Sequence, residues 1–402
     1  MKNRVSFTLF SLLPFLLIVV DVKIYWVFHL LLLFVVVLER KFGTKFKSHL
    51  FLLLVIPLFW TCLFSFSDSL YFTTQALFYL TTPILLLIVG MKMSRVVNQK
   101  LVFKYIIYFG TIGALYYTGL AFFNFGLNSF ADPYAIRDFS PWGSIASVMA
   151  VFLIMFSKKY GFVLIKNQKF KYCLIGVNLI AIYFSASRTY YFIFMIFAFV
   201  FLYHYNKKLT VVFIGLSVFL YSAFLVSDSD NKLINKFQTS TAEVSIGNYQ
   251  VDEDINVKYR GYETAMALEA YWSGTEMNLL FGHGFEKQVD LKADVLLGDK
   301  YRRIIPIIHN GYLYILIKTG FFGLLFFGFF FLKLYRLKRY VPDFLLLNML
   351  LAACIVSLLF SNYVVGTFFS MEMSVLWVLF GIYIGYVEIA RRRNSFAKPL
   401  NK

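Results

Sequence analysis

The chain has 402 residues, of which 60% are hydrophobic and 20% aromatic, and its formal net charge is +18. Soluble globular proteins are about 45–50% apolar and lack long uncharged apolar runs, so this composition excludes a soluble multidomain protein. The positive charge lies largely in short loops between apolar runs. This placement favours a role in membrane topology and argues against a nucleic-acid partner.

Twelve apolar runs are candidates for transmembrane helices, each of which needs roughly 20 mostly apolar residues. They cover residues 5–20, 24–38, 50–66, 70–90, 101–123, 143–157, 172–185, 189–203, 209–226, 311–332, 344–360 and 371–388. The first run follows a basic start, as in a signal peptide, but no small-residue cleavage site follows it, so we expect an uncleaved helix. The sequence therefore predicts an all-α, polytopic integral membrane protein with about twelve transmembrane helices.

The orientation follows from the loops that hold most of the 39 lysines and arginines. Basic residues gather at both termini and in alternate loops, for example in residues 39–47 and 157–171. By the positive-inside rule, these segments face the cytoplasm. We therefore expect a multi-pass protein of the cell inner (plasma) membrane with cytoplasmic N- and C-termini, whose basic loops contact anionic membrane lipid.

One long polar segment, residues 227–308, departs from this pattern. It holds thirteen acidic and nine basic residues, and the order of the helices places it on the outer, periplasmic side. Within it, "KYRGYETAMALEAYW" has helical periodicity, with Tyr259, Tyr262 and Met266 on one face, and Gly274 follows its end. We expect a partly helical outer loop that covers the membrane part.

The chain thus divides into four predicted parts. These are N-terminal membrane helices over residues 1–226, the large outer loop over 227–308, C-terminal membrane helices over 309–388 and a basic cytoplasmic tail over 389–402.

Three arginines on the predicted outer side are candidate ligands for an anion. Arg188 lies in the tight turn of "YFSASRTYYF", Arg260 begins the loop helix, and Arg137 lies in "FADPYAIRDFSPWG" beside Asp132 and Asp138. Each also has a simpler explanation: Arg188 reaching a lipid phosphate, Arg260 being solvated, and Arg137 forming a local ion pair.

His309 precedes an apolar helix in "IIPIIHNGYLYILIKTG". A histidine at the outer membrane boundary can be neutral near pH 7 and accept a proton, although an interfacial histidine bonded to a loop is the simpler alternative. Leu313, Leu316, Gly320 and Gly323 share its predicted face, where the glycines allow a lipid or another backbone to approach closely.

Other polar groups are given structural interpretations. Lys318 and Glu372 are expected to form a buried pair within the membrane helices, and His283 lies between two turn glycines without an assigned role. The sequence contains no Gly-rich phosphate loop, zinc motif or Gly-x-Ser-x-Gly elbow, and we expect neither a metal site nor a cofactor.

Several of these elements occur in an order that resembles a known superfamily. The "SRT" turn with Arg188, the "YRGYETA" helix with Arg260, the "GHGF" turn and "HNGYLYILIKTGFFGLLFF" together resemble the O-antigen polymerase and O-antigen ligase superfamily. The resemblance covers roughly residues 180–330, and elsewhere it depends on topology alone.

This resemblance implies a metal-independent, inverting glycosyltransferase whose donor is an oligosaccharide linked to undecaprenyl diphosphate. It implies that His309 is the catalytic base and that Arg188 and Arg260 bind the diphosphate. It also makes Arg137 and Asn310 candidates for binding the substrate.

The superfamily contains two activities. A polymerase transfers the growing glycan onto the next lipid-linked repeat unit, whereas a ligase transfers the polymer to lipid A–core. Ligases often have an acidic residue soon after the His-Asn step, whereas Gly311 follows Asn310 here, which favours the polymerase. Ligase is the alternative, and a lipid-linked oligosaccharide flippase or transporter ranks lower. The expected partners are lipid-linked repeat units and a chain-length-determining co-polymerase.

Overall fold

The computed structural model describes residues 49–65, 69–130, 133, 135–136, 145–226, 238–239, 243, 245–247, 255, 258–297, 300–366, 368, 370 and 373–396. The first two predicted helices, Arg137 and Glu372 lie outside the described residues. Every other predicted apolar helix is present, with ends that differ by a few residues.

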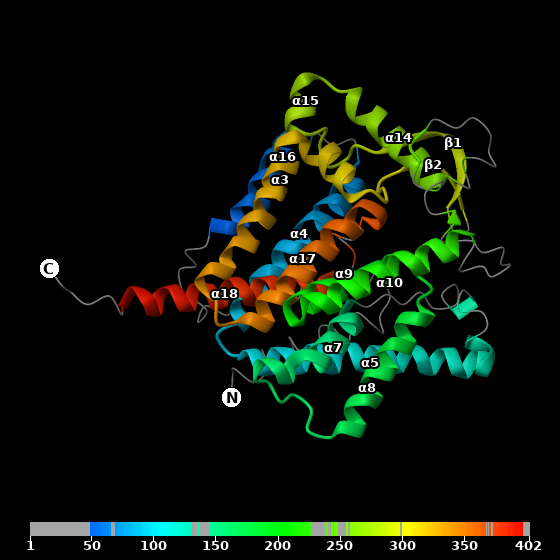
Figure 1. The fold of residues 1–402 in the computed structure, drawn as a ribbon. Helices are drawn as coiled ribbons and strands as arrows, with labels where there is room; N and C mark the ends of the chain where they lie inside the picture. The colour runs from blue at the N-terminus through cyan, green and yellow to red at the C-terminus, as the bar shows by residue number, and fades with distance from the viewer. Residues whose placement is uncertain are drawn as a thin grey trace.

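The helices from these apolar runs form the larger part of the fold (Figure 1). They are α3 (Leu52–Phe64), α4 (Leu70–Met93), α5 (Gln99–Phe125), α7 (Ile145–Phe156), α8 (Gln168–Phe184), α9 (Arg188–Tyr205), α10 (Lys207–Val226), α16 (Gly311–Arg336), α17 (Leu345–Val365) and α18 (Ser374–Phe396). Short 3-10 turns extend several of them. Helix α4 packs along α18, α5 packs on α7 and α8, α9 packs on α17, and α3 packs on α16.

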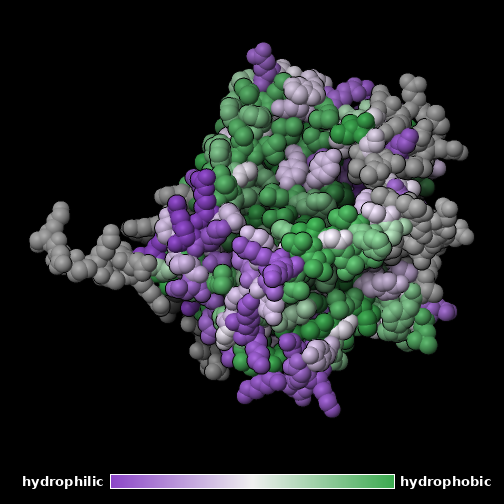
Figure 2. Space-filling view, in the orientation of Figure 1, coloured by the Kyte–Doolittle hydropathy of each residue, from purple (hydrophilic) through white to green (hydrophobic). Residues whose placement is uncertain are grey.

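Five helical stretches in the described part of the chain are long and apolar enough to cross a membrane. They are Leu70–Met93, Gln99–Phe130, Gly311–Tyr340, Leu345–Val365 and Ser374–Arg392. Large apolar side chains such as Phe59, Phe123 and Val211 are exposed, as in helices that face hydrocarbon. Figure 2 shows hydrophobic side chains over the middle of one face, with hydrophilic ones gathered toward its lower left. The fold is therefore that of a multi-pass membrane protein, and the full count of about twelve helices stays a prediction.

The long loop forms a small folded unit at one end of the molecule, above the start of α16 (Figure 1). It contains α14 (Tyr259–Trp272), α15 (Glu276–Phe281) and an antiparallel hairpin of β1 (Val289–Leu297) and β2 (Lys300–Ile305). The predicted helix is present, and Tyr262 and Met266 on its predicted face are buried.

The hairpin corrects the all-α expectation for this loop. In β1, buried Val289 and Leu291 alternate with the exposed Asp290, which is the period-2 pattern of a half-buried strand. The pairing is irregular between Asp290 and Val295, and Lys292 there has a positive φ of 59°. Burial nevertheless alternates along the whole of β1, so a period-2 signal was present in the sequence although the strand was not predicted.

A second hydrophobic core attaches the loop unit to the membrane helices. Tyr262 and Met266 of α14, Phe285 of the connecting turn and Leu291 of β1 belong to one cluster with Ile317 of α16. Burial of such large side chains contributes about 1.5–3 kcal/mol each, so the loop unit is held firmly on α16. The start of α16 thereby takes a defined position beneath α14.

Helix α16 is broken at Gly320, which corrects the continuous face predicted for it. Gly320 has φ 72° and ψ −177°, a conformation accessible essentially only to glycine. The break leaves carbonyl groups without helical partners. The His283 N–H donates to the Ile317 carbonyl at 2.8 Å, and Trp60 Nε1 donates to the Thr319 carbonyl at 3.1 Å. The "GHGF" turn therefore packs into the break.

Lys318 reinforces this junction. Its Nζ donates to the carbonyls of Phe285 at 2.6 Å and Lys287 at 2.5 Å, both in the loop unit. These bonds satisfy a buried ammonium group next to the break. Its predicted partner Glu372 lies outside the described residues, so that pair stays untested.

Candidate functional site

Two of the predicted arginines meet at one carboxylate. Arg188 begins α9, and Arg260 lies in the first turn of α14. Arg188 forms a short ion pair with Glu243, and Arg260 Nε lies 3.1 Å from the other oxygen of the same carboxylate. The two guanidinium groups thus converge from separate elements on one anion, although 72 positions separate them in the chain.

A glycine allows the segment with Glu243 to reach α14. A Cβ atom at Gly261 would lie only 1.8 Å from the Ser245 carbonyl oxygen, so any side chain there would push the two apart. Gly261 directly follows Arg260, and Ser245 is two residues beyond Glu243. In the "YRG" step, Arg260 pairs with Glu243, and Gly261 leaves space for the segment that contains Glu243 and Ser245.

A second pair of side chains lies one turn further along α14. Glu263 is buried, with 2% of its side chain exposed, and its Oε2 accepts a hydrogen bond from the His309 N–H at 2.9 Å. The Nδ1 atom of the His309 ring lies 3.0 Å from the same oxygen and 3.2 Å from Oε1. Because a carboxylate only accepts hydrogen bonds, this geometry places the ring proton on Nδ1.

Tyr259 completes the surroundings of this carboxylate. Its hydroxyl donates to Glu263 Oε1 at 3.2 Å, and its ring lies edge-on to the His309 ring, with 5.7 Å between centroids. Burial, and then the negative charge and hydrogen bond of Glu263, raise the pKa of Tyr259 well above its ordinary value. The hydroxyl therefore stays protonated and acts as a donor to Glu263.

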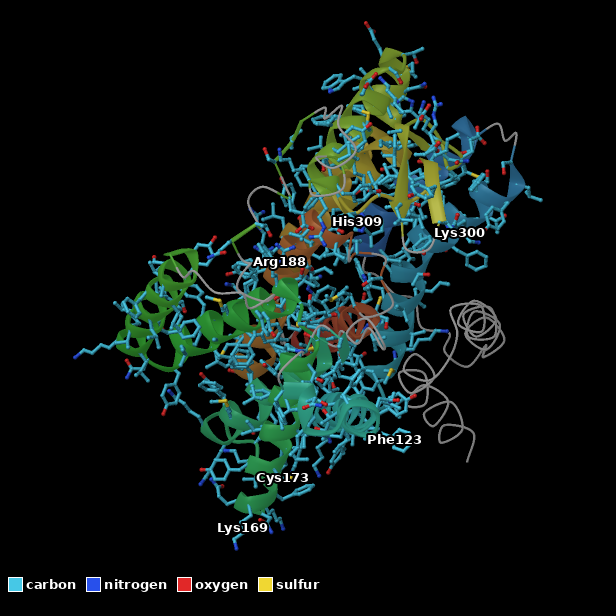
Figure 3. The ribbon with its side chains drawn as sticks, turned by 90° about the vertical axis from the view of Figure 1, so that its right-hand side faces the viewer. Phe123, Lys169, Cys173, Arg188, Lys300 and His309 are labelled. Carbon is cyan, nitrogen blue, oxygen red and sulfur yellow. The ribbon has the colours of Figure 1, made fainter. Side chains whose placement is uncertain are left out.

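Arg260 of the first cluster and Glu263 and His309 of the second line one pocket. It is lined by Arg260, Glu263, Thr264, His309, Asn310, Tyr363 and Val364, which come from α14, the start of α16 and the end of α17. The His309 side chain is 41% exposed, so its ring is accessible from this pocket. Figure 3 shows Arg188 and His309 near one another where the loop unit meets α9, with Lys169 at the opposite end of the molecule.

The start of α16 is positioned by asparagines. Asn310 is buried and its Oδ1 accepts hydrogen bonds from the N–H groups of Tyr312 and Leu313, which caps the helix. The next residue, Gly311, packs tightly on α17, since a Cβ there would lie 2.1 Å from Asn362 Oδ1. The predicted site residue Asn310 therefore lines the pocket and also fixes the residue before it, His309.

The structure brings Arg188, Arg260, His309 and Asn310 to one region, where the loop unit meets α9 and the start of α16. Arg188 and Arg260 both pair with Glu243. Arg137 lies outside the described residues and stays a prediction.

Sequence reasoning missed the two carboxylates. Glu263 is three residues after Arg260 in "YRGYE" and so shares its side of the helix, a signal that was present in the sequence. Glu243 carried no comparable signal. Among the described residues, no group of three or more His, Cys, Asp or Glu side chains is placed to hold a metal ion.

The fold and this site define a multi-pass membrane protein whose pocket holds an arginine, a buried glutamate and an accessible histidine. Residues 173–328 are similar to the family model described as O-antigen ligase. The matched segment contains all of Arg188, Glu243, Arg260, Glu263 and His309. No curated protein matches the chain.

Proposed function

We propose that the protein is an O-antigen polymerase, a glycosyltransferase of surface polysaccharide synthesis. It would transfer the growing glycan from undecaprenyl diphosphate onto the next lipid-linked repeat unit. The observation that carries this proposal is the convergence of Arg188, Arg260 and His309 from three separate elements on one end of a membrane protein, within the segment that matches the family. An anion-binding pair beside an accessible imidazole suits the transfer of a group from a diphosphate to a hydroxyl.

The reaction can be written with these residues. The acceptor sugar hydroxyl gives its proton to His309 Nε2, the ring nitrogen that Glu263 does not contact. The hydroxyl oxygen bonds to the anomeric carbon of the donor while the bond from that carbon to the phosphate oxygen breaks. The electron pair of that bond leaves with the lipid diphosphate, whose charge Arg188 and Arg260 stabilise.

A direct displacement of this kind inverts the anomeric carbon. In the proposal, the guanidinium groups supply the charge stabilisation that a divalent cation supplies in many nucleotide-sugar enzymes. The protein would therefore act without a metal ion. Arg137 is proposed as a further substrate ligand, and Asn310 as a group that contacts substrate in addition to capping α16.

We propose that the site faces the periplasm. The basic segment 157–171, which includes Lys169, lies at the end of the molecule opposite to His309 (Figure 3). By the positive-inside rule, that basic end faces the cytoplasm, with both termini on the same side in an inner-membrane protein. The lipid-linked donor would then reach the site from the outer leaflet, and a co-polymerase that sets chain length is the proposed protein partner.

The ligase activity is the second candidate because the matching family is described as O-antigen ligase. The absence of an acidic residue directly after Asn310 supports the polymerase, since Gly311 stands there and packs against Asn362. A longer side chain at position 311 would have to displace the end of the Asn362 side chain.

The glycan profile of a deletion strain tests the proposal, with surface and lipid-linked pools measured together. Core bearing a single repeat unit, restored to a ladder by wild type and not by His309→Ala, is the expected result. Unmodified core with long polymer retained on undecaprenyl diphosphate would show a ligase. Repeat units that stay on the cytoplasmic leaflet would show a flippase, and a normal ladder would refute all three activities.

A further inference from the structure

We infer that Glu263 is the positioning residue of the transfer reaction: it holds the His309 ring in the tautomer and orientation that leave Nε2 free for the acceptor hydroxyl. This inference rests on the proposed function and extends it to a residue that the sequence did not single out. It starts from the contacts that surround one buried carboxylate.

Three hydrogen-bond donors meet at the Glu263 carboxylate. The His309 N–H, the His309 Nδ1 and the Tyr259 hydroxyl all contact its two oxygens, at distances between 2.9 and 3.2 Å. A carboxylate can accept all three, because it has two oxygens and no hydrogen to donate. A neutral amide at this position would have only one accepting oxygen and would also present a donor to Nδ1.

The Glu263 side chain is buried, whereas the His309 side chain is accessible. Only 2% of the Glu263 side chain is exposed, whereas 41% of the His309 side chain is. A carboxylate taken out of water needs bonded donors to compensate for its lost hydration. The three donors supply that compensation, so the carboxylate and the ring hold each other in one geometry. The buried side of the imidazole is thereby bound, and its other side is left to the pocket.

Two hydrogen bonds join Glu263 to His309, one from the backbone N–H and one from the ring Nδ1. The backbone bond fixes the residue just before the Asn310 cap, and the ring bond fixes the rotation of the side chain. When Nε2 takes the proton of the acceptor hydroxyl, the ring becomes positive, and the adjacent carboxylate stabilises that charge. Glu263 therefore acts through His309 and does not contact the reacting atoms.

The test compares three variants of the full-length protein purified in nanodiscs, with lipid-linked repeat units extracted from the deletion strain as substrate. Glu263→Gln is expected to lower kcat by about 100-fold or more with little change in KM, since the acid–base partner is misoriented while the arginines are intact. Glu263→Asp keeps the charge and should recover part of kcat. Glu269→Gln is the matched control, because Glu269 lies on the same helix with an exposed side chain paired to Lys292, and it should retain wild-type kcat.

A spectroscopic measurement separates the orientation of the ring from the activity. The ¹⁵N shifts of the His309 ring, assigned by comparison with His309→Gln, should report a proton on Nδ1 in wild type and in Glu263→Asp. In Glu263→Gln the signal should shift toward the other tautomer or become a mixture. A merely structural role for Glu263 would change thermal stability without moving this tautomer signal.

The outcomes distinguish this inference from the proposed function. If His309→Ala is inactive while Glu263→Gln has wild-type kcat and an unchanged tautomer, the inference is wrong and the proposed function stands. If wild type transfers no glycan, the proposed function is wrong, and the ¹⁵N shifts still decide whether Glu263 orients the ring. If Glu263→Gln does not fold, Glu263→Asp tests the inference in its place. A wild-type kcat in Glu263→Asp, together with a mixture of the two His309 tautomers, would refute the inference.

Discussion

Arg188 and Arg260 share a single carboxylate, that of Glu243, although Arg188 begins α9 and Arg260 lies in the first turn of α14 in the loop unit. The two guanidinium groups form an anion-binding arrangement that is occupied by a carboxylate of the protein itself, that of Glu243. Two guanidinium groups and one carboxylate leave a positive excess among these three side chains. A diphosphate carries more negative charge than Glu243, so it would compete for the same two guanidinium groups.

Removal of the Glu243 charge should therefore strengthen binding of a diphosphate. For Glu243→Gln we expect the inhibition constant of inorganic pyrophosphate, measured in the glycan-transfer assay, to fall about fivefold. That factor corresponds to roughly 1 kcal/mol, the size of a partly exposed ion pair. Glu276→Gln, in the first turn of α15, is the control for a change of charge alone. A weaker inhibition by pyrophosphate would instead mean that Glu243 builds the arginine pair and does not compete with the ligand.

Replacing each arginine by lysine tests whether the planar, two-pronged geometry of guanidinium matters. Lysine keeps the charge, but its three donors share one nitrogen atom, so it lacks the planar fork with which a guanidinium binds two phosphate oxygens side by side. For Arg188→Lys and Arg260→Lys we expect KM for the lipid-linked donor to rise about tenfold, with larger losses for the alanine variants. Arg303→Lys, on the exposed hairpin and paired with Asp290, should leave KM unchanged. If all three lysine variants had the wild-type KM, Arg188 and Arg260 would not be ligands of the lipid-linked donor.

The membrane helices could be predicted from the sequence because each follows from one local property, an apolar run of sufficient length. The loop helix α14 could also be predicted, since Tyr262 and Met266 recur at helical spacing and both are buried. The hairpin was not predicted, although Val289, Leu291 and Val295 alternate with charged residues in β1, which is the period-2 signal of a half-buried strand.

The site was predicted in part for a similar reason. Arg188, Arg260 and His309 stand out in the sequence because each is a polar group beside an apolar run. Glu243 and Glu263 lie in a polar loop, where acidic residues are common, and their significance comes from tertiary contacts to Arg188, Arg260 and His309. The pairing of Glu263 with His309 depends on how α14 packs on α16, which the local spacing of residues does not predict.

The break in α16 makes a prediction about stability. Gly320→Ala would force a left-handed backbone on a residue with a side chain, and its Cβ would lie 2.4 Å from the Leu280 carbonyl oxygen. We expect a loss of at least about 1–3 kcal/mol, measured as a lower Tm of the purified protein. The matched control is Gly328→Ala in the same helix, where nothing lies within 4 Å of the added carbon. There, alanine should be neutral or stabilising, because it favours a helix more than glycine does. A similar Tm for both variants would contradict the assigned backbone strain.

The turn that packs into this break should make stability depend on pH. The His283 Nε2 lies 2.9 Å from the Tyr271 carbonyl, and burial lowers the pKa of His283 below its ordinary value of 6.5, more than that hydrogen bond raises it. The neighbouring charge of Lys287 lowers the pKa further. The unfolded chain therefore binds more protons than the folded one in mildly acidic solution. The stability that neutral His283 contributes is fully present above pH 6.5 and is lost as the pH falls below it.

His283→Gln should flatten this dependence, because glutamine can still donate to the Tyr271 carbonyl but does not titrate. We expect the Tm of wild type to fall more steeply between pH 7 and pH 5 than the Tm of His283→Gln, with the two closest at neutral pH. His204→Gln, which replaces an exposed histidine at the end of α9, should keep the wild-type slope. Parallel slopes for wild type and His283→Gln would show that the turn remains docked on α16 whether or not His283 is protonated.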